Sequence, residues 1–390
     1  MARTTKRTRT DAGGREGLGG SASARLGELD LLQRIRLRAA HAPTAELRLG
    51  IGDDCALLRL APDEEFAVTT DLSIAGRHFR FDWHPPESVG HRALARGLSD
   101  LAAMGARPVA AFLSLALPAD LVQGAKRRSA HQGKDLVQNS KARSAAPAPF
   151  IDRFLDGFLA LAAAYHVPLA GGDLAESTLA VADVVLTGAV ARGQALLRSG
   201  ARPGDLIYVT GNLGGAAAGL AYLSRLDATF KRSSQRARLQ ALGRISPRVK
   251  AVLSPHLYPT PRIAQGLWLA RNAMASAAID LSDGLSTDLA HICAESGVGA
   301  ELFAEALPIA HGASPLQVLH GGEDYELLFT APPTARVPSS IEGVPVTRIG
   351  RIVARESAGK SARPSAAPPV TLITPKGAEP LVPQGWQHFA

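Results

Sequence analysis

The sequence has little cysteine and no long apolar run. Only two of its 390 residues are cysteine, Cys55 and Cys293, without the Cys-x-x-Cys or Cys/His spacing of a disulfide framework or a zinc site. Both are interpreted as small buried side chains rather than nucleophiles. The longest apolar run, VAAFLSLALP, is far too short to span a membrane, and residues 1–24 contain no apolar signal core. These absences predict a soluble, cytoplasmic protein with no membrane partner.

Several common catalytic motifs are also missing. The chain has no G-x-x-x-x-G-K-[ST] phosphate loop, and GNLGGAAAGL does not match G-x-G-x-x-G. Neither the protein-kinase motif set nor a G-x-S-x-G elbow occurs. GNLGGAAAGL is more typical of a tight strand-to-helix turn, in which small residues allow close packing.

The formal net charge of +8 is concentrated in two short segments. Residues 1–24 carry five basic and two acidic side chains, and residues 123–149 carry six and one, so together they account for the whole excess. Both segments are rich in Ser, Ala, Gly or Gln and lack periodicity, which is typical of a disordered tail and a surface insertion. The rest of the chain is neutral, so nucleic acid is not expected as the main partner.

Alternating strand and helix patterns predict an α/β (layered α+β) fold with mixed or antiparallel sheets flanked by helices. In the first half, strands are expected at 64–71, 108–118, 168–173 and 181–190, and helices at 85–106 and 150–166. In the second half, strands are expected at 201–211, 276–280, 299–305, 325–331 and 345–353, and helices at 214–226, 261–273 and 284–296. The expected division is a disordered tail at 1–24, an N-terminal domain at 25–193 that contains the 123–149 insertion, and a C-terminal domain at 194–390.

Aspartates recur beside Gly, Ser or Thr, mostly where apolar strands are expected to end. They are Asp53, Asp54, Asp71, Asp100, Asp173, Asp280 and Asp283. In α/β sheets the loops that leave strand ends form ligand sites. Carboxylates and hydroxyls without histidine in metal-ligand spacing suit a hard divalent cation, Mg²⁺ above all, which shares its coordination with substrate phosphates. The pattern favours metal-assisted phosphoryl transfer.

The same aspartates admit a structural interpretation. An aspartate beside Gly or Ser is commonly a turn former or a helix N-cap, and Asp100 is spaced to pair with Arg96 one turn earlier on a helix. Spacing alone leaves both interpretations open. The number of such clusters, each flanked by an apolar strand or helix, argues for a shared site.

Eight stretches of the chain resemble, in order, those of the thiamine-monophosphate kinase family. They are GIGDDCALL, TTDLSIAGRHF, ALARGLSDLAAMGARP, LAGGDLAES, LLRSGARPGDLIYVTGNLGG, AAIDLSDGLSTDLAHIC, GGEDYELLFT and GWQHF. The resemblance implies the two-domain fold of the aminoimidazole ribonucleotide synthetase superfamily and a homodimer. It also implies Mg²⁺-dependent, direct in-line transfer of the ATP γ-phosphoryl group to thiamine monophosphate, giving thiamine diphosphate and ADP.

The resemblance further implies roles for individual residues. The metal ions would be held by Asp54, Thr69, Thr70, Asp71, Asp100, Asp173, Asp280 and Asp283. ATP would be bound by Tyr165, Gly172, Asp173, Arg198 and Ser282. The thiamine end would be lined by His78, Glu323 and Trp386. No residue would act as a covalent nucleophile. The N-terminal domain would bind ATP and metal and form the dimer, and the C-terminal domain would complete the active site.

The chain also departs from the family pattern. Leu174 and Ala175 stand where polar residues are usual, and Gly215 stands where an aspartate is frequent. One alternative is another ATP-dependent enzyme of the same superfamily, although a selenophosphate synthetase would be expected to carry a reactive N-terminal cysteine and residues 1–24 have none. A nucleic-acid-binding protein acting through the basic segments is the alternative of a different class, and its binding would fall steeply with salt.

Overall fold

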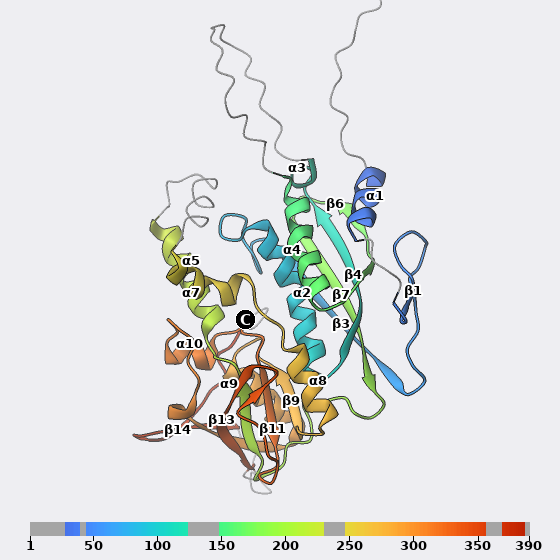
Figure 1. Cartoon of the computed structure of the whole chain (residues 1–390). Coiled ribbons are helices and arrows are strands. Elements are labelled where there is room, and N and C mark those ends of the chain that lie inside the picture. Colours follow the sequence, from blue (N-terminus) through green and yellow to red (C-terminus); the bar gives the residue numbers. More distant parts are fainter. Residues whose placement is uncertain (1–27, 40–43, 124–147, 230–245, 356–368, 387–390) are drawn as a thin grey trace, which may run out of the picture.

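The computed structural model describes residues 28–39, 44–123, 148–229, 246–355 and 369–386. The 1–24 tail and nearly all of the 123–149 insertion, both predicted to be disordered or surface segments, lie outside these ranges. The described chain has two large sheets with their helices, one built from the first half of the sequence and one from the second (Figure 1), and a further two-stranded sheet.

The first sheet has five strands, in the order β3-β7-β4-β5 with β6 paired to β4. Its strands are β3 (Glu64–Ile74), β4 (Arg107–Leu117), β5 (Leu169–Gly171), β6 (Leu174–Glu176) and β7 (Val181–Ala191). The β3–β7 and β7–β4 pairs are antiparallel, whereas β5 and β6 pair in parallel with β4. The sheet is therefore mixed, as predicted.

Two long helices, α2 (Pro86–Ala103) and α4 (Phe150–Ala164), pack together beside this sheet (Figure 1). α2 begins at a proline, which is well suited to the first turn of a helix, and buries Leu94 and Leu98 completely. The helices touch at two glycines, because a Cβ at Gly90 or Gly157 would lie within 2 Å of a backbone oxygen of the other helix. The first half is completed by α1 (Glu28–Arg38), α3 (Ala119–Gln123), β1 (Leu47–Leu49) and β2 (Leu57–Leu58).

The two faces of strand β3 differ. Phe66, Val68 and Leu72 alternate along it and are 52%, 61% and 50% exposed. Because neighbouring residues of a strand point to opposite faces, Thr69 and Asp71 face the other way. The described chain thus leaves an apolar row on one face of β3 exposed to solvent.

The second sheet has eight strands, in the order β15-β14-β10-β13-β8-β11-β9 with β12 paired to β13. Its strands are β8 (Leu206–Thr210), β9 (Ala277–Asp280), β10 (Val298–Phe303), β11 (Leu327–Ala331), β12 (Ser340–Ile341), β13 (Val344–Ala354), β14 (Val370–Thr374) and β15 (Gly377–Pro380). Its helices are α5 (Gly215–Thr229), α7 (Pro247–Leu257), α8 (Ile263–Arg271), α9 (Leu285–Ser296) and α10 (Pro315–His320), with a 3₁₀ turn at Ala304–Ala306.

The predicted strands and helices are confirmed within a few residues at their ends. One prediction about cysteine is wrong: Cys293 is buried, but Cys55 is exposed because it follows Asp53 and Asp54 in a surface loop. Within the described ranges, no helix combines the length and apolar character needed to cross a membrane.

Candidate functional site

A cleft of about 650 Å³ is lined by residues of both halves of the chain. Eight residues named from the sequence lie in its wall: Asp71, His78, Asp100, Asp280, Ser282, Asp283, Glu323 and Trp386. They come from strand β3 and the loop after it, helix α2, the end of β9 and the loop after it, the 321–325 loop and the C-terminal segment. The fold thus brings together residues more than 300 positions apart in sequence.

Three of the aspartates in the cleft wall lie in different secondary-structure contexts. Asp280 is the last residue of β9, as its sequence context predicted. Asp71 lies within β3, which continues to Ile74, and Asp100 lies inside helix α2, so neither is at a strand end. Gly284, which has a φ of +116°, turns the chain from the Asp280–Asp283 loop into α9.

Asp71, Asp100 and Asp280 make up the acidic end of the cleft. Burial first, and then the negative charges of Asp100 and Asp71, raise the pKa of Asp280 to about 7. Burial likewise raises the pKa of Asp71 to about 6 and raises that of Asp100. Ser99 Oγ donates to Asp280 Oδ2 at 2.8 Å, and Thr69 Oγ1 donates to Asp100. These carboxylates are destabilised in their charged form, so a bound cation would be stabilising here.

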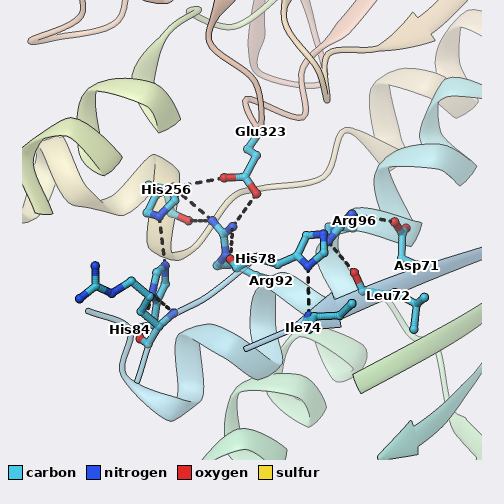
Figure 2. A network of polar contacts seen from close by, with 10 residues as sticks. Asp71, Leu72, Ile74, His78, His84, Arg92, Arg96, His256 and Glu323 are labelled. Atoms are coloured by element: carbon cyan, nitrogen blue, oxygen red, sulfur yellow. Dashed lines mark hydrogen bonds and ion pairs between the residues drawn. The ribbon is translucent and has the colours of Figure 1, made fainter. Parts of the chain in front are cut away.

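Two arginines partly offset this negative charge. Arg96 Nη2 lies 3.2 Å from Asp71 Oδ1, and Arg96 Nη1 donates to the backbone oxygen of Leu72 at 3.0 Å (Figure 2). The suggested Arg96–Asp100 ion pair is therefore replaced by one with Asp71. The charge of Arg198 lowers the pKa of both Asp100 and Asp280, so Arg198 is close enough to act on the acidic end.

The sequence patterns did not point to Asp288, which extends the acidic end into α9. Its carboxylate accepts the backbone N–H groups of Asp283 and Gly284 at 3.1 and 2.9 Å. Burial first, and then the charges of Asp280 and Asp283, raise its pKa to about 8. Ligand atoms of Asp283, Asp288 and His291 lie within 4.8 Å of one another. The available signal was the spacing in SDGLSTD, which places Asp288 one turn into the helix that follows the loop.

Glu323 marks the other end of the cleft. Its backbone has a φ of +68°, which is uncommon for a residue with a side chain, and its N–H donates to Ser282 O at 2.8 Å. Arg92 Nη2 donates to Glu323 Oε1 at 2.6 Å, and His256 Nδ1 lies 3.5 Å from Oε2. Figure 2 shows Glu323 reaching from the opposite wall toward Arg92, which comes from helix α2. This end of the cleft is held together by ion pairs and hydrogen bonds within the protein.

A buried pair of histidines lies behind Glu323. His84 and His256 are 3% and 2% exposed, and their Nε2 atoms are 3.1 Å apart. Burial, and next the nearby charge of Arg92, lower the pKa of His84 to about 3 and lower that of His256 strongly. Both rings are therefore neutral at physiological pH. The sequence patterns did not point to Arg92 or to either histidine.

The remaining proposed site residues lie outside the wall of this cleft. Thr70 points to the opposite face of β3 from Asp71. Tyr165 OH donates to Pro261 O at 2.8 Å. Asp54 and Asp173 are exposed, and each of the loops that contain them is shaped by an aspartate accepting the next backbone N–H. The full set outside the cleft wall is Asp54, Thr69, Thr70, Tyr165, Gly172, Asp173 and Arg198.

The positions that depart from the family pattern have defined structural places. Leu174 and Ala175 lie in the short strand β6, which pairs with β4. Gly215 begins helix α5, where Asp324 accepts the N–H groups of Gly214 and Ala216 at 2.6 and 3.1 Å. The start of α5 is thus capped by a carboxylate from the GGEDYE motif.

The donor set of the acidic end fits a hard divalent cation. It consists of carboxylate oxygens, with the Ser99 and Thr69 hydroxyls bonded to them. Burial, and at Asp71 and Asp280 also the charge of neighbouring carboxylates, raises the pKa values of these aspartates. Oxygen ligands with uncompensated negative charge are what Mg²⁺ prefers.

Two family models match the chain. The model described as AIR synthase related protein, N-terminal domain, matches residues 52–191, and that of the corresponding C-terminal domain matches residues 202–360. The thiamine-monophosphate kinase of Salmonella typhimurium LT2 is 38% identical over 344 residues, covering 84% of this chain and 91% of that one. The chain belongs to the thiamine-monophosphate kinase family within the AIR synthase related proteins.

Solved structures agree with this assignment. The thiamine-monophosphate kinase from Stenotrophomonas maltophilia K279a has 35% identity and a TM-score of 0.64, covering 86% of this chain and 95% of that one. AaThiL complexed with AMPPCP and TMP has 29% identity and a TM-score of 0.63, covering 95% of this chain and 100% of that one.

Proposed function

We propose that this protein transfers the γ-phosphoryl group of ATP to thiamine monophosphate in a Mg²⁺-dependent reaction, giving thiamine diphosphate and ADP. Membership of the family and the relative complexed with AMPPCP and TMP support this activity. The observation that carries it is a single cleft in which Asp71, Asp100 and Asp280 lie at one end and Glu323 at the other. One end suits metal-bound phosphates, and the other suits an organic acceptor.

In this proposal the ligands of the metal ions in the cleft are Asp71, Asp100, Asp280 and Asp283. When bound, Mg²⁺ supplies positive charge that neutralises the phosphate oxygens and aligns the phosphoryl group. Thr69 orients Asp100 through its hydroxyl. Asp54, Thr69, Thr70 and Asp173 keep their proposed metal role outside the cleft wall.

Ser282 and Arg198 are the proposed ATP contacts nearest the acidic end. Tyr165 and Gly172 are further proposed ATP contacts. Ser282 lies in the cleft wall between two aspartates, and Arg198 supplies a positive charge that acts on that end. His78, Glu323 and Trp386 are the proposed contacts of the thiamine moiety. Trp386 offers an aromatic face to a cationic ring, and Glu323 offers an acceptor to the exocyclic amine.

The acceptor determines what the protein must do. A phosphomonoester carries about −1.5 to −2 charges at neutral pH, so its oxygen is already nucleophilic and needs no strong general base. The obstacle is repulsion between the acceptor phosphate and the ATP triphosphate, and the protein overcomes it by positioning and charge neutralisation. We therefore propose that no protein side chain is phosphorylated. Recovery of a labelled, acid-stable or hydroxylamine-sensitive phosphoprotein from γ-labelled ATP under turnover would refute this mechanism.

We also propose a homodimer, a domain division near residue 193 and a cytoplasmic location. The apolar row of Phe66, Val68 and Leu72 on β3 supports the dimer, because a long exposed apolar strand is usually covered by a partner. The two free cysteines are consistent with a reducing compartment. Val68→Glu should convert a dimer to monomers in analytical ultracentrifugation, and a wild-type protein that sediments as a monomer would contradict the dimer.

The deciding experiment is formation of thiamine diphosphate by purified protein with ATP, Mg²⁺ and thiamine monophosphate. Product that disappears with a chelator, and is not formed from unphosphorylated thiamine, would support the reaction, acceptor and metal together. If folded protein binds Mg-ATP but forms no product, the acceptor must be another superfamily substrate. Salt-sensitive nucleic-acid binding that is lost with the basic segments would favour the alternative of a different class.

A further inference from the structure

The Glu323 carboxylate is bound by Arg92 on one oxygen and lies close to His256 on the other, and neither side chain has a role assigned so far. Arg92 Nη2 donates to Oε1 at 2.6 Å, and His256 Nδ1 lies 3.5 Å from Oε2 (Figure 2). The Arg92 side chain is only 5% exposed, whereas that of Glu323 is 29% exposed and lines the cleft. Arg92 also donates to the backbone oxygens of His256 and His78. It therefore joins the segments that carry His78, His256 and Glu323.

The tautomers of the histidine pair determine whether His256 Nδ1 can donate a hydrogen bond to Glu323. Both rings are neutral, so the 3.1 Å contact between their Nε2 atoms needs one protonated and one bare nitrogen. His84 Nδ1 lies 3.1 Å from the backbone nitrogen and 3.2 Å from the backbone oxygen of Arg80, so these contacts alone do not fix its proton. His256 Nδ1 lies 3.3 Å from Arg92 Nη1 and 3.5 Å from Glu323 Oε2. We assign the proton of His256 to Nδ1, because Arg92 Nη1 already donates to the His256 backbone oxygen, whereas a carboxylate favours a facing N–H over a bare nitrogen.

Helix α2 links this arrangement to the acidic end. Arg92, Arg96 and Asp100 are four residues apart and share one face of the helix. The rise from Arg92 to Asp100 is roughly 12 Å in an α-helix. The helix is rigidly packed, with Leu94, Ala95 and Leu98 fully buried. One rigid element therefore sets the separation between the Glu323 anchor and the acidic end.

We propose that Arg92 is a positioning residue that, with the His256–His84 pair, fixes Glu323 so that its remaining lone pairs accept N–H donors from the acceptor ring. This inference rests on the proposed function and deepens it. With one oxygen held by Arg92 and the other by His256, the orientation of the free lone pairs toward the cleft is set before substrate binds. The arrangement selects for a ring that presents an amino group and against one that presents a carbonyl there.

The chemistry of that selection is specific. A 4-aminopyrimidine donates hydrogen bonds to a carboxylate, whereas a 4-oxo ring turns a carbonyl oxygen toward it. Sites built around a substrate N–H reject an analogue that lacks it far more strongly than apolar pockets reject a change in size. Oxythiamine monophosphate, in which the amino group is replaced by a carbonyl, is the matched probe. The wild-type protein should prefer thiamine monophosphate in kcat/KM by at least about a hundredfold.

The test uses full-length protein with four variants. Arg92→Lys keeps the charge but loses the planar fork, so KM for thiamine monophosphate should rise about tenfold with kcat within about threefold, and the preference over the oxo analogue should fall about tenfold. His256→Leu should weaken the preference less, and His256→Asn should restore it, because the amide N–H replaces the Nδ1–H. Arg153→Lys changes an arginine–carboxylate pair outside the cleft and is the control.

A double-mutant cycle separates positioning from a general structural role. If Arg92 acts through Glu323, Arg92→Lys should have no further effect on KM in a Glu323→Gln background. Effects that multiply independently, or an unchanged preference between the two acceptors in Arg92→Lys and His256→Leu, would overturn the inference. KM for ATP and the melting temperature show whether each variant is folded. If Arg92→Lys does not fold, the His256→Leu and His256→Asn pair decides by the same criterion.

The proposed function and the positioning role of Arg92 are refuted by different results. Wild-type protein that makes no thiamine diphosphate from the monophosphate refutes the proposed function. Wild-type protein that is active but accepts the oxo analogue equally well refutes only the positioning inference.

Discussion

The two ends of the cleft handle charge in opposite ways. At the acidic end Asp71, Asp100 and Asp280 are crowded. Burial raises the pKa values of all three, and neighbouring carboxylates add to the rise at Asp71 and Asp280. At the other end the charge of Glu323 is matched by Arg92 within the protein. The first end is incomplete without added positive charge, and the second is already neutral as a pair. The acidic end therefore suits a ligand that brings positive charge, and the Glu323 end suits a ligand that donates hydrogen bonds.

This difference in charge also distinguishes electrostatic binding of metal and phosphate from directional hydrogen bonding of the acceptor. Uncompensated carboxylates bind metal ions, and through them phosphates, with large electrostatic energies. A carboxylate that is already paired adds little net charge attraction, but its fixed lone pairs give directional selectivity. We expect changes at the acidic end to affect turnover and changes at the Glu323 end to affect acceptor binding.

The largest effect is expected from Asp280→Asn. The substitution removes a charge from the centre of the proposed metal site while keeping the shape of the side chain and its contact with Ser99. Turnover should fall about a thousandfold or more, because metal-assisted phosphoryl transfer depends on that charge. Thiamine diphosphate formation is the measurement, with Asp156→Asn, an exposed carboxylate paired with Arg38, as the control. Near wild-type turnover would show that Asp280 is a structural turn residue.

Glu323→Gln should have the next largest effect. An amide keeps one acceptor oxygen but loses the charge that faces Arg92, so binding of an amino-bearing ring weakens. We expect KM for thiamine monophosphate to rise about 10- to 100-fold with a smaller change in kcat, measured by steady-state kinetics. A loss confined to kcat would show that Glu323 acts in the chemical step and not in acceptor binding. The two ends of the cleft would then not differ in function as proposed.

The dependence of stability on pH tests the acidic end in a different way. The folded-state pKa of Asp280 is about 7 against an ordinary value of 3.8, so the folded protein binds more protons than the unfolded chain between these values. Stability without metal should therefore fall as pH rises from about 4 to about 7, and Asp71, at about 6, contributes in the same direction. Bound Mg²⁺ replaces those protons, so its stabilising effect should grow over the same range.

Thermal melts with and without Mg²⁺ at pH 5.5 and pH 8 measure this effect. We expect the increase in Tm caused by Mg²⁺ to be larger at pH 8 by about 3 °C or more. Asp280→Asn should reduce the difference between the two pH values. An increase in Tm that is equal at both values, or larger at pH 5.5, would contradict the proposed role of these carboxylates.

The smallest effect is expected from Arg153→Gln, outside the cleft. Arg153 makes a two-pronged ion pair with Glu87, but both side chains are about one-third exposed. Such surface pairs contribute about 0–1 kcal/mol. Kinetic constants for both substrates should be unchanged, and Tm should shift by no more than a few degrees. A marked loss of activity would mean that the packing of α2 on α4 affects the geometry of the cleft.

The sequence could predict the parts of the site that have a local signal. Asp280 follows a short apolar strand, Asp283 precedes a glycine turn, and both stand in a motif shared with a family, so their placement in one cleft was predictable. Asp100 was predicted from its place among the aspartates beside Gly, Ser or Thr and from that resemblance, while a pairing with Arg96 one turn earlier was left open as the structural alternative. Arg96 in fact pairs across to strand β3.

Long-range pairs had no such signal. Arg92 and Glu323 are 231 residues apart, and His84 and His256 are 172 apart. Each looks ordinary in its own segment, and only the packing of α7 beside the 78–84 loop makes the cluster. The pattern for α7 itself was obscured because Pro255 lies inside the helix. Strands β14 and β15 were missed because they are short and flanked by turn residues.

One stretch of backbone is shared by both ends of the cleft. Leu281 and Ser282 accept hydrogen bonds from the N–H groups of Tyr325 and Glu323, and Asp283 O accepts from Trp386 at 3.2 Å. Any displacement of this loop by a bound nucleotide therefore also displaces the groups proposed to hold the acceptor. The affinities for the two substrates are then thermodynamically linked, and each must change the binding of the other by the same factor, whichever arrives first.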